Sequence, residues 1–367
     1  MQADGVILLF SRDVGATNQL LAVLDAFARL GGGAGTRWDN DSLIESLLIR
    51  AVGESSLASL LAKGSVVMGK DFALERFRQA GVTVQDWGEL EASGATVADM
   101  LEALQVKLVI TGTTDVDDRT DVEFWEAARR CGIPSVVFLD HVSSLDLRFR
   151  NPHSQTVLPD FVYLPNAFGR QALLDLGMSR LALTEGPDLH LEKLARKTAI
   201  DDSEIAAKRG EWVGNRQVSV VLFVSECTRE VGASYERLPY DEVDVAHQLT
   251  CALRRGIVIN GRVHGPDDTL LIIRPHPKDR KGKYDAFRSN LRPTTLIDGT
   301  TDLCVALSAA DTIIGMDSTV LHEAKILGRP TFSVVSVGWF ARVWGNEVVL
   351  DLGFANDDGG VGQADEV

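Results

Sequence analysis

The sequence predicts an α/β protein with two doubly wound halves, each a parallel sheet with helices on both faces. Short apolar runs alternate with amphipathic stretches along most of the chain, which is the pattern of repeated strand–helix–strand units. The runs are continuous in Val, Ile and Leu, as expected of strands that are buried on both faces. The alternation stops once, in a polar stretch, and then restarts. Because 367 residues suffice for two domains, we expect two Rossmann-like domains that face a central crevice.

The first half begins with an apolar run at residues 6–10, and a helical pattern follows over residues 16–30. A glycine-rich polar stretch at residues 31–42 has no phosphate-binding spacing, and we expect a flexible insertion there. Three further apolar runs each end in polar residues and predict strands at residues 107–110, at residues 135–139 and within residues 161–166. We place the first domain at residues 1–185.

The middle of the chain predicts a connection between the domains. Residues 186–217 are polar and prone to form helix, and they contain no apolar run. Alternation restarts with a strand within residues 218–226, and a helical stretch follows at residues 242–255. We place the second domain at residues 218–350. The tail at residues 351–367 is rich in Gly and Asp, and we expect it to be disordered.

Composition and charge restrict the classes of partner. No apolar run approaches the ~20 residues that a membrane helix needs. The first apolar run has no basic leader before it, so we expect a first strand rather than a signal peptide, and a cytoplasmic location. The net charge of −15 argues against duplex nucleic acid and against docking on anionic lipid by charge alone. It does not exclude a small anionic ligand, because a local site can be positive on a negative protein.

Cysteine spacing predicts neither a disulfide framework nor a metal site. The four cysteines stand far apart without a CxxC pair, and we expect buried free thiols. They are Cys131, Cys227, Cys251 and Cys304. We expect no metal site, because no set of ligands has matching spacing, and we expect no cofactor.

Ligands of doubly wound sheets bind at the carboxyl ends of the strands, so the residues after each strand are the candidates for a site. Arg12, Asp13, Gly15 and Asn18 follow the first strand. Asp13 and Gly15 are typical of a helix N-cap and a turn. Asp13 is equally suited to accept a proton from a substrate hydroxyl as a general base. The stretch lacks the GxGxxG pattern, which disfavours a dinucleotide.

Two further strand ends carry polar side chains. Asp140 and His141 follow the strand within residues 134–139, and we expect one of them to line the acceptor side of the crevice. Adjacent strand residues point to opposite faces, so both can line one site only if the strand has ended. Ser225 and Glu226 follow the first strand of the second half. Glu226 either binds a ligand hydroxyl or caps a helix.

The segment "IIRPHPKD" places a histidine between two prolines at the end of a buried strand. Each proline pushes its predecessor toward an extended conformation, which holds Arg274 and His276 extended. Alternation predicts that both side chains lie on one face. An imidazole N–H beside a guanidinium suits a phosphate, although proline at a strand end also serves simply to stop pairing.

The segment "GMDSTVLHEAKILGRP" predicts a strand end followed by a helix. Ser318 and Thr319 open the helix, where free N–H groups and two hydroxyls form an anion site. Glu323 lies four residues after Thr319 and therefore faces the same way one turn deeper. A carboxylate at that position suits the paired hydroxyls of a ribose. The alternative is an ordinary N-cap with a glutamate that faces solvent.

These two segments resemble the C-terminal half of GT-B glycosyltransferases. "RPHP" and "DSTVLHEA" look like the HP and Ser/Thr motifs of bacterial sialyltransferases and related capsule enzymes, and they are also similar to CDP-glycerol polymer transferases. The resemblance implies that His276, Ser318 and Thr319 hold the donor phosphate and that Glu323 holds the ribose. It also implies that Asp13, in "RDVG", is the general base.

The resemblance implies a metal-independent glycosyltransferase for surface polysaccharide or glycoconjugate synthesis. It would move a sugar, for example a nonulosonic acid from a CMP-sugar, to a hydroxyl acceptor, with a UDP-sugar as the other donor considered. The second domain would bind the donor and the first domain the acceptor. Alternatives are a CDP-glycerol-type transferase, a non-catalytic nucleotide-sugar-binding protein and a UDP-GlcNAc 2-epimerase. The epimerase "DSGG" is replaced by "DST" here, and its "GTRPE" opening is missing.

Overall fold

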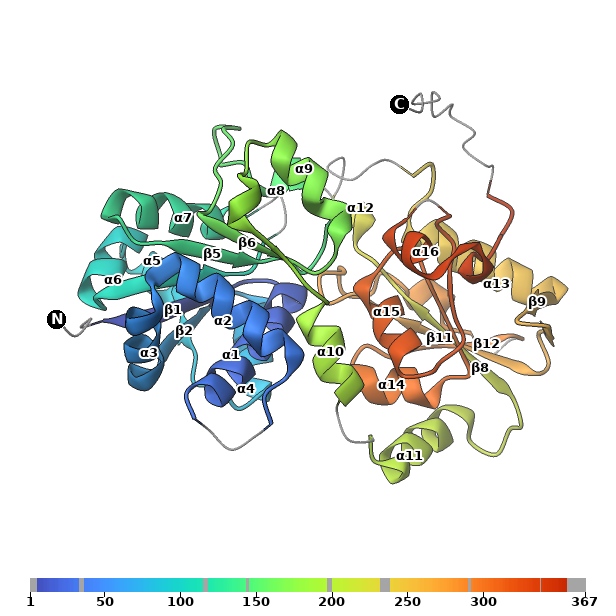
Figure 1. The fold of residues 1–367 in the computed structure, drawn as a ribbon. Helices are drawn as coiled ribbons and strands as arrows, with labels where there is room; N and C mark the ends of the chain where they lie inside the picture. Colours follow the sequence, from blue (N-terminus) through green and yellow to red (C-terminus); the bar gives the residue numbers. More distant parts are fainter. Residues whose placement is uncertain are drawn as a thin grey trace. The chain divides into compact units, whose positions relative to one another are not determined.

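A computed structural model of the chain divides into two compact units, Met1–Arg196 and Lys197–Val367. It describes residues 5–32, 36–114, 118–142, 145–196, 200–231, 238–289, 292–336 and 338–354. Figure 1 shows both units as ribbons. Most of the tail predicted to be disordered, from residue 355 on, lies outside the described residues.

Unit 1 contains a seven-stranded parallel sheet in the order β3-β2-β1-β4-β5-β6-β7. Its strands are β1 (Val6–Ser11), β2 (Ser65–Gly69), β3 (Gln85–Asp86), β4 (Val106–Thr111), β5 (Ser135–Phe138), β6 (Phe161–Leu164) and β7 (Leu183–Glu185). The side chains of β1 alternate between two apolar clusters: Leu8 and Phe10 enter one, and Ile7 and Leu9 enter the other. The sheet is therefore buried on both faces, as its continuous apolar runs predicted.

Helices cover both faces of this sheet (Figure 1). They are α1 (Val14–Leu30), α2 (Asp39–Val52), α3 (Glu54–Lys63), α4 (Phe72–Gln79), α5 (Trp87–Ala92), α6 (Val97–Ala103), α7 (Thr120–Cys131), α8 (Leu145–Arg148), α9 (Arg170–Asp175) and α10 (Leu189–Arg196), with the 3₁₀ turns η1 (Ala167–Gly169) and η2 (Arg180–Ala182).

The flexible insertion predicted at residues 31–42 is wrong for its last part, because α2 begins at Asp39. Asp41 accepts hydrogen bonds from the Trp38 backbone N–H at 2.8 Å and from the Arg29 guanidinium at 2.7 Å. Arg29 belongs to α1, so a contact between two helices holds the start of α2. Residues 33–35 lie outside the described residues.

Unit 2 contains a five-stranded parallel sheet in the order β12-β11-β8-β13-β14. Its strands are β8 (Ser219–Val224), β11 (Thr269–Arg274), β12 (Thr294–Ile297), β13 (Thr312–Gly315) and β14 (Thr331–Ser333). A separate antiparallel hairpin pairs β9 (Ile257–Ile259) with β10 (Arg262–His264). Val221 and Phe223 of β8 enter one apolar cluster, and Val220 and Leu222 enter another.

The helices of unit 2 follow the predicted alternation. They are α11 (Asp202–Val213), α12 (Thr228–Val231), α13 (Glu242–Arg255), α14 (Leu303–Ala309), α15 (Thr319–Ile326) and α16 (Trp339–Trp344), with the 3₁₀ turns η4 (Asp285–Phe287) and η5 (Asn346–Val348). The helix predicted at residues 242–255 coincides with α13. The predicted α/β class with two doubly wound parallel sheets is thus confirmed.

The polar stretch at residues 186–217 contains two helices, one in each unit. α10 packs on α1 in unit 1, and α11 packs on α14 in unit 2. Residues 197–199 between these helices lie outside the described residues.

No disulfide joins the four cysteines, but the expectation that they are buried is wrong. Cys131 is exposed, and the other three are half-buried. Cys131 is the last residue of α7, where the helix ends at the surface. Over the described ranges, the chain forms no helix with both the length and the apolar character to span a bilayer.

Candidate functional site

The sheet order of unit 2 brings three predicted segments to one edge. β11, β8 and β13 are neighbouring parallel strands, so their carboxyl ends lie side by side. His276 follows β11, Ser225 follows β8, and Ser318 follows β13. The strand ends of a doubly wound sheet are where this type of fold binds ligands. We refer to this edge as the unit 2 edge.

His276 lies in a tight turn directly after β11. Its carbonyl oxygen accepts the Asp279 backbone N–H at 2.9 Å. Its ring Nδ1 accepts the Lys278 backbone N–H at 3.1 Å. Because Nδ1 is an acceptor, the neutral ring carries its proton on Nε2, which makes Nε2 a hydrogen-bond donor. His276 as a whole residue is half-buried.

Arg274 is the last residue of β11, and its guanidinium is already engaged. Nη1 donates to the carbonyl oxygen of Thr301 at 2.8 Å. Burial lowers the pKa of Arg274, while the charges of Asp298, Asp302 and Glu323 act in the opposite direction. Since β11 ends at Arg274, strand alternation no longer determines where the side chain of His276 points.

The start of α15 shows the N-cap that the sequence left as an alternative. Ser318 has an extended backbone, and its Oγ accepts the Val320 backbone N–H at 3.2 Å. A hydroxyl that accepts one bond can still donate its proton to another acceptor. Thr319 is half-buried, and Glu323, one turn later, is only 5% exposed. The same alternative had Glu323 facing solvent, and that part of it is wrong because Glu323 is buried.

Glu226 contacts the segment that precedes α15. Its Oε1 accepts the Asp317 backbone N–H, and the Ser318 backbone N–H is a second donor to the same carboxyl. Burial, the largest cause, raises the pKa of Glu226 to about 8. Asp317 itself accepts backbone N–H groups of Trp339 at 2.8 Å and Phe340 at 2.7 Å, at the start of α16.

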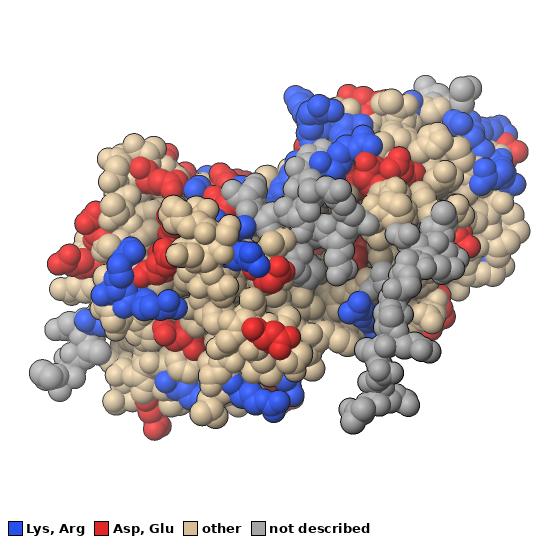
Figure 2. All heavy atoms as spheres, turned by 90° about the horizontal axis from the view of Figure 1, so that it is seen from above, with Lys and Arg blue, Asp and Glu red and all other residues tan. Residues whose placement is uncertain are grey.

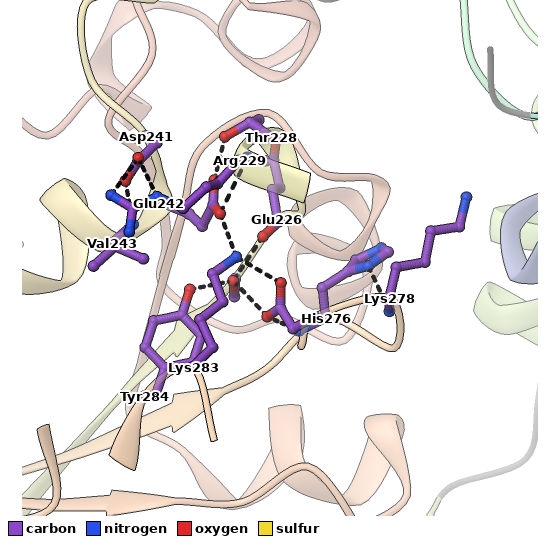
Figure 3. A network of polar contacts seen from close by, with 12 residues as sticks. Glu226, Thr228, Arg229, Asp241, Glu242, Val243, His276, Lys278, Lys283 and Tyr284 are labelled. Atoms are coloured by element: carbon purple, nitrogen blue, oxygen red, sulfur yellow. Dashed lines mark hydrogen bonds and ion pairs between the residues drawn. The ribbon is translucent and has the colours of Figure 1, made fainter. Parts of the chain in front are cut away.

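Ser225 belongs to a buried polar network at the same edge, and Figure 3 labels its members Tyr284, Lys283 and Glu242. Its Oγ lies 2.5 Å from the Tyr284 hydroxyl and 3.1 Å from Asp279 Oδ2. Asp279 Oδ1 in turn accepts from Lys283 Nζ at 2.7 Å, and Lys283 also contacts Glu242 of α13. The sequence predicted no role for these partners of Ser225, because they become neighbours only in the folded unit.

In unit 1, Asp13 occupies the N-cap position of α1 without capping it. Its side chain accepts no capping hydrogen bond, although its backbone carbonyl accepts the Thr17 N–H at 2.9 Å. Asp13 Oδ1 lies 3.9 Å from Arg12 Nη1. Arg12 is engaged mainly with Asp71 at 2.8 Å and Asp118 at 3.4 Å.

Asp140 approaches the first turn of α1 through a gap that Gly15 leaves. A Cβ at Gly15 would lie 2.4 Å from Asp140 Oδ2, so the close approach depends on the glycine. Asp140 Oδ1 accepts the Thr113 hydroxyl at 3.0 Å and lies 3.5 Å from Arg148 Nη1. β5 ends at Phe138, so the strand has ended before Asp140. Thr113 and Arg148 are partners that sequence reasoning missed.

Asn18 and His141 are two other predicted residues of unit 1. Asn18 accepts a hydrogen bond from Arg76 Nε at 2.7 Å, which joins α1 to α4. Asn18 is 8% exposed, so its amide is largely enclosed. His141 is half-buried in the loop after β5.

A cleft of about 510 Å³ in unit 1 lies elsewhere. Its described lining residues include Lys70, Asp118, Arg119 and Arg150, and none of the residues predicted from the sequence is among them. Lys70 Nζ lies 3.2 Å from Asp118 and 3.0 Å from Glu91, so its charge is compensated within the cleft.

Electrostatics at the surface are mixed. Figure 2 shows Lys and Arg interspersed with Asp and Glu on the face that it draws. The net charge of −15 therefore does not make that face uniformly acidic. Within the described ranges, no cluster of three or more His, Cys, Asp or Glu side chains is arranged to hold a metal ion.

Comparison with known proteins shows the fold. No protein-family model matches the chain, and no curated protein matches its sequence. Among solved structures, the UDP-N-acetylglucosamine 2-epimerase of Rickettsia bellii is similar with a TM-score of 0.56 and 14% identity, over 92% of this chain and 80% of that one. The Methanocaldococcus jannaschii UDP-GlcNAc 2-epimerase, in complex with UDP-GlcNAc and UDP, is similar with a TM-score of 0.56 and 13% identity. The match covers 90% of this chain and 83% of that one.

A third similar structure is Anabaena Alr3699/HepE in complex with UDP-glucose, with a TM-score of 0.54 and 14% identity, over 90% of this chain and 80% of that one. Identities this low establish the fold and not the activity. The two-domain, GT-B-like architecture that the sequence predicted is confirmed by these structures.

Proposed function

We propose that the protein is a glycosyltransferase that moves a sugar from a nucleotide-activated donor to a hydroxyl acceptor. The observation that carries this proposal is the unit 2 edge, where an imidazole with a donor Nε2 and the start of α15 follow neighbouring strands of one sheet. Both are suited to bind phosphate oxygens. The proteins of similar fold whose complexes contain UDP, UDP-GlcNAc or UDP-glucose support a nucleotide-sugar ligand.

The donor phosphate is bound by His276 and by the hydroxyls of Ser318 and Thr319, with the positive end of the α15 dipole. Glu323 takes the ribose hydroxyls, and its negative charge acts on nearby Arg274. As the sugar leaves, negative charge develops on the phosphate oxygen. These preorganised donors stabilise that charge, without requiring a metal ion to do so.

Asp13 acts as the general base on the acceptor. Asp13 follows β1 at the carboxyl end of the strand, where this type of fold binds its ligands, and this position supports the role. The carboxylate takes the proton of the acceptor hydroxyl while that oxygen bonds to the anomeric carbon. The bond from the anomeric carbon to the phosphate oxygen breaks, and the nucleotide leaves with the electron pair.

The donor is a CMP-sugar or a UDP-sugar. The HP and Ser/Thr motifs of the sequence, which resemble those of sialyltransferases, favour CMP, for example with a nonulosonic acid as the sugar. The UDP complexes among proteins of the same fold favour UDP. A CDP-linked compound is the third possible donor. We place the product in a surface polysaccharide or glycoconjugate.

A second candidate function is epimerisation of a UDP-sugar. It is favoured by the fold likeness to two UDP-GlcNAc 2-epimerases. An epimerase would change the sugar without any acceptor, whereas a transferase would release the nucleotide only slowly until an acceptor is added. A non-catalytic binding protein would retain the nucleotide sugar unchanged.

The test is incubation of the protein with CMP-, UDP- and CDP-activated compounds, with and without a panel of glycan acceptors. Release of nucleotide that depends on an acceptor supports the transferase, and a new epimer without nucleotide release supports the epimerase. His276→Ala should weaken nucleotide binding by about tenfold or more. The matched control is His247→Ala, an exposed histidine of α13 in the same unit.

Asp13→Asn should retain nucleotide binding and lose turnover by about 10²-fold or more. Asp25→Asn, at an ion pair on the surface of the same helix, is the control. Full turnover by Asp13→Asn would exclude Asp13 as the base. Unchanged nucleotide affinity in His276→Ala would exclude the proposed phosphate site.

A further inference from the structure

Lys283 connects two buried carboxylates next to the turn that contains His276 (Figure 3). Its Nζ contacts Glu242 and lies 2.7 Å from Asp279 Oδ1. The side chains of Lys283, Glu242 and Asp279 are 4%, 0% and 2% exposed. Buried charges are tolerated only when they are paired and hydrogen-bonded. The three side chains therefore form one unit, in which each charge depends on the others.

The second oxygen of Asp279 bonds to the strand ends of the unit 2 edge. Asp279 Oδ2 accepts the His276 backbone N–H at 2.7 Å and the Ser225 hydroxyl at 3.1 Å. His276 follows β11, and Ser225 follows β8. One carboxylate thus joins the ends of two neighbouring strands, with Lys283 on its other oxygen.

Asp279 and His276 also close the turn from both sides. The Asp279 backbone N–H donates to the His276 carbonyl at 2.9 Å, while the His276 N–H donates to the Asp279 side chain. Within that turn, the Lys278 N–H donates to His276 Nδ1, which sets the tautomer of the ring. Opening the turn would therefore change both the direction of the ring and the nitrogen that carries its proton.

We propose that Asp279 is a positioning residue for His276, and that Lys283 and Glu242 hold the Asp279 carboxylate in place. This arrangement presents the Nε2–H of His276 to a phosphate of the nucleotide before the nucleotide binds. The inference rests on the proposed phosphate-binding function of His276. Nothing in the motif "RPHP" identifies this network, because Glu242 is separated from Lys283 by 41 positions.

The first experiment needs no ligand. In protein labelled with ¹⁵N-histidine, the two ring nitrogens of His276 report which of them carries the proton. The parent should show a protonated Nε2 and an acceptor Nδ1. Asp279→Asn places an amide N–H₂ against either Lys283 or the His276 N–H, so we expect a mixed tautomer population at His276. An unchanged His276 spectrum in a folded Asp279→Asn protein would overturn the proposal.

The second experiment is a double-mutant cycle with CMP and UDP as probes, each titrated separately. Asp279→Asn should weaken the affinity about tenfold in the parent. In the His276→Ala background the same change should weaken it less than about twofold, because Asp279 acts through His276. An equal loss in both backgrounds would show a merely structural role and would refute the inference.

Two variants complete the design. Asp285→Asn, an exposed aspartate paired with Arg288 in the next turn, should change neither the His276 spectrum nor the affinity. If Asp279→Asn does not fold, Ser225→Ala replaces it, because it removes one donor to Asp279 Oδ2. Ser225→Ala should also shift His276 toward a mixed tautomer population. An unchanged His276 spectrum in Ser225→Ala would refute the inference. If the parent binds neither nucleotide, the proposed function fails, while the labelled spectra still decide the positioning role.

Discussion

Replacing Lys283 with methionine should destabilise unit 2 by about 3 kcal/mol at pH 8. Methionine keeps most of the apolar stem but removes the ammonium group. Glu242 and Asp279, at 0% and 2% side-chain exposure, then lose the cation that pairs with both of them. Breaking a buried ion pair costs about 3–5 kcal/mol, and we take the lower end because both carboxylates keep other hydrogen bonds. Glu242 keeps Arg229 N–H, for example, and Asp279 keeps His276 N–H.

The pH dependence of Lys283→Met gives the same reasoning a second test. Burial already raises the pKa of Asp279 above its ordinary value, and Lys283 opposes that shift. Removing the ammonium group therefore raises the folded-state pKa of Asp279 further, so the folded state of the variant binds more protons. The loss of unfolding free energy in Lys283→Met is therefore largest at a pH above the folded-state pKa of Asp279. It should shrink as the pH is lowered from about 8 toward 5. Urea unfolding followed by tryptophan fluorescence measures it at both pH values.

Lys208→Met is the matched control. Lys208 lies 2.6 Å from Glu211, whose side chain is 66% exposed, and 3.8 Å from Asp298, which is beyond hydrogen-bond distance. Exposed pairs of this kind contribute little to stability, so the unfolding midpoint should hardly move. A Lys283→Met protein as stable as this control at pH 8, or a deficit that grows as the pH is lowered, would refute the reasoning.

Three further predictions follow from the packing and the site. Gly112→Ala should destabilise unit 1 by about 1–3 kcal/mol, because its Cβ would lie 2.3 Å from the Ala16 Cβ, whereas Gly210→Ala in open space on α11 should not; equal urea midpoints would contradict this. The raised pKa of Glu226, about 8, means that the folded state keeps a proton that the unfolded state loses above about pH 4.5, so Glu226 should make the parent less stable as the pH rises from about 4.5 to 8. Glu226→Gln should remove this fall in the free energy of unfolding. Parallel curves of unfolding free energy against pH for the two proteins would exclude this role of Glu226. Glu323→Gln should weaken binding of CMP or UDP about tenfold but leave their 2′-deoxy forms nearly unaffected in titration calorimetry, and equal losses would remove the ribose role.

Much of the fold was predictable because its signals are local. The runs at residues 6–10 and within 218–226 are buried on both faces as β1 and β8, and the pattern at residues 242–255 is α13. Weaker signals were missed, such as β2, which holds only five residues between two helices. The start of α2 was missed because its cap depends on Arg29 of another helix.

The candidate site was predictable only in part. Each residue after a strand was identifiable, but its partner was not. Asn18 was placed in the crevice from its position after β1, and the structure pairs it with Arg76, 58 positions away. Asp13 was equally consistent with a cap and a base, and the structure shows no capping hydrogen bond from its side chain. Its role as a base stays a prediction.

The sequence alone determined the two doubly wound halves, the strand ends and the stiff segment around His276, because apolar periodicity and proline act within a few residues. Tertiary structure decided which of these ends meet. The order β11-β8-β13 places His276, Ser225 and Ser318 on one edge. The folded unit also brings Glu242 of α13 to Lys283 and Asp279. Such contacts depend on burial and charge pairing across distant segments, which no local pattern contains.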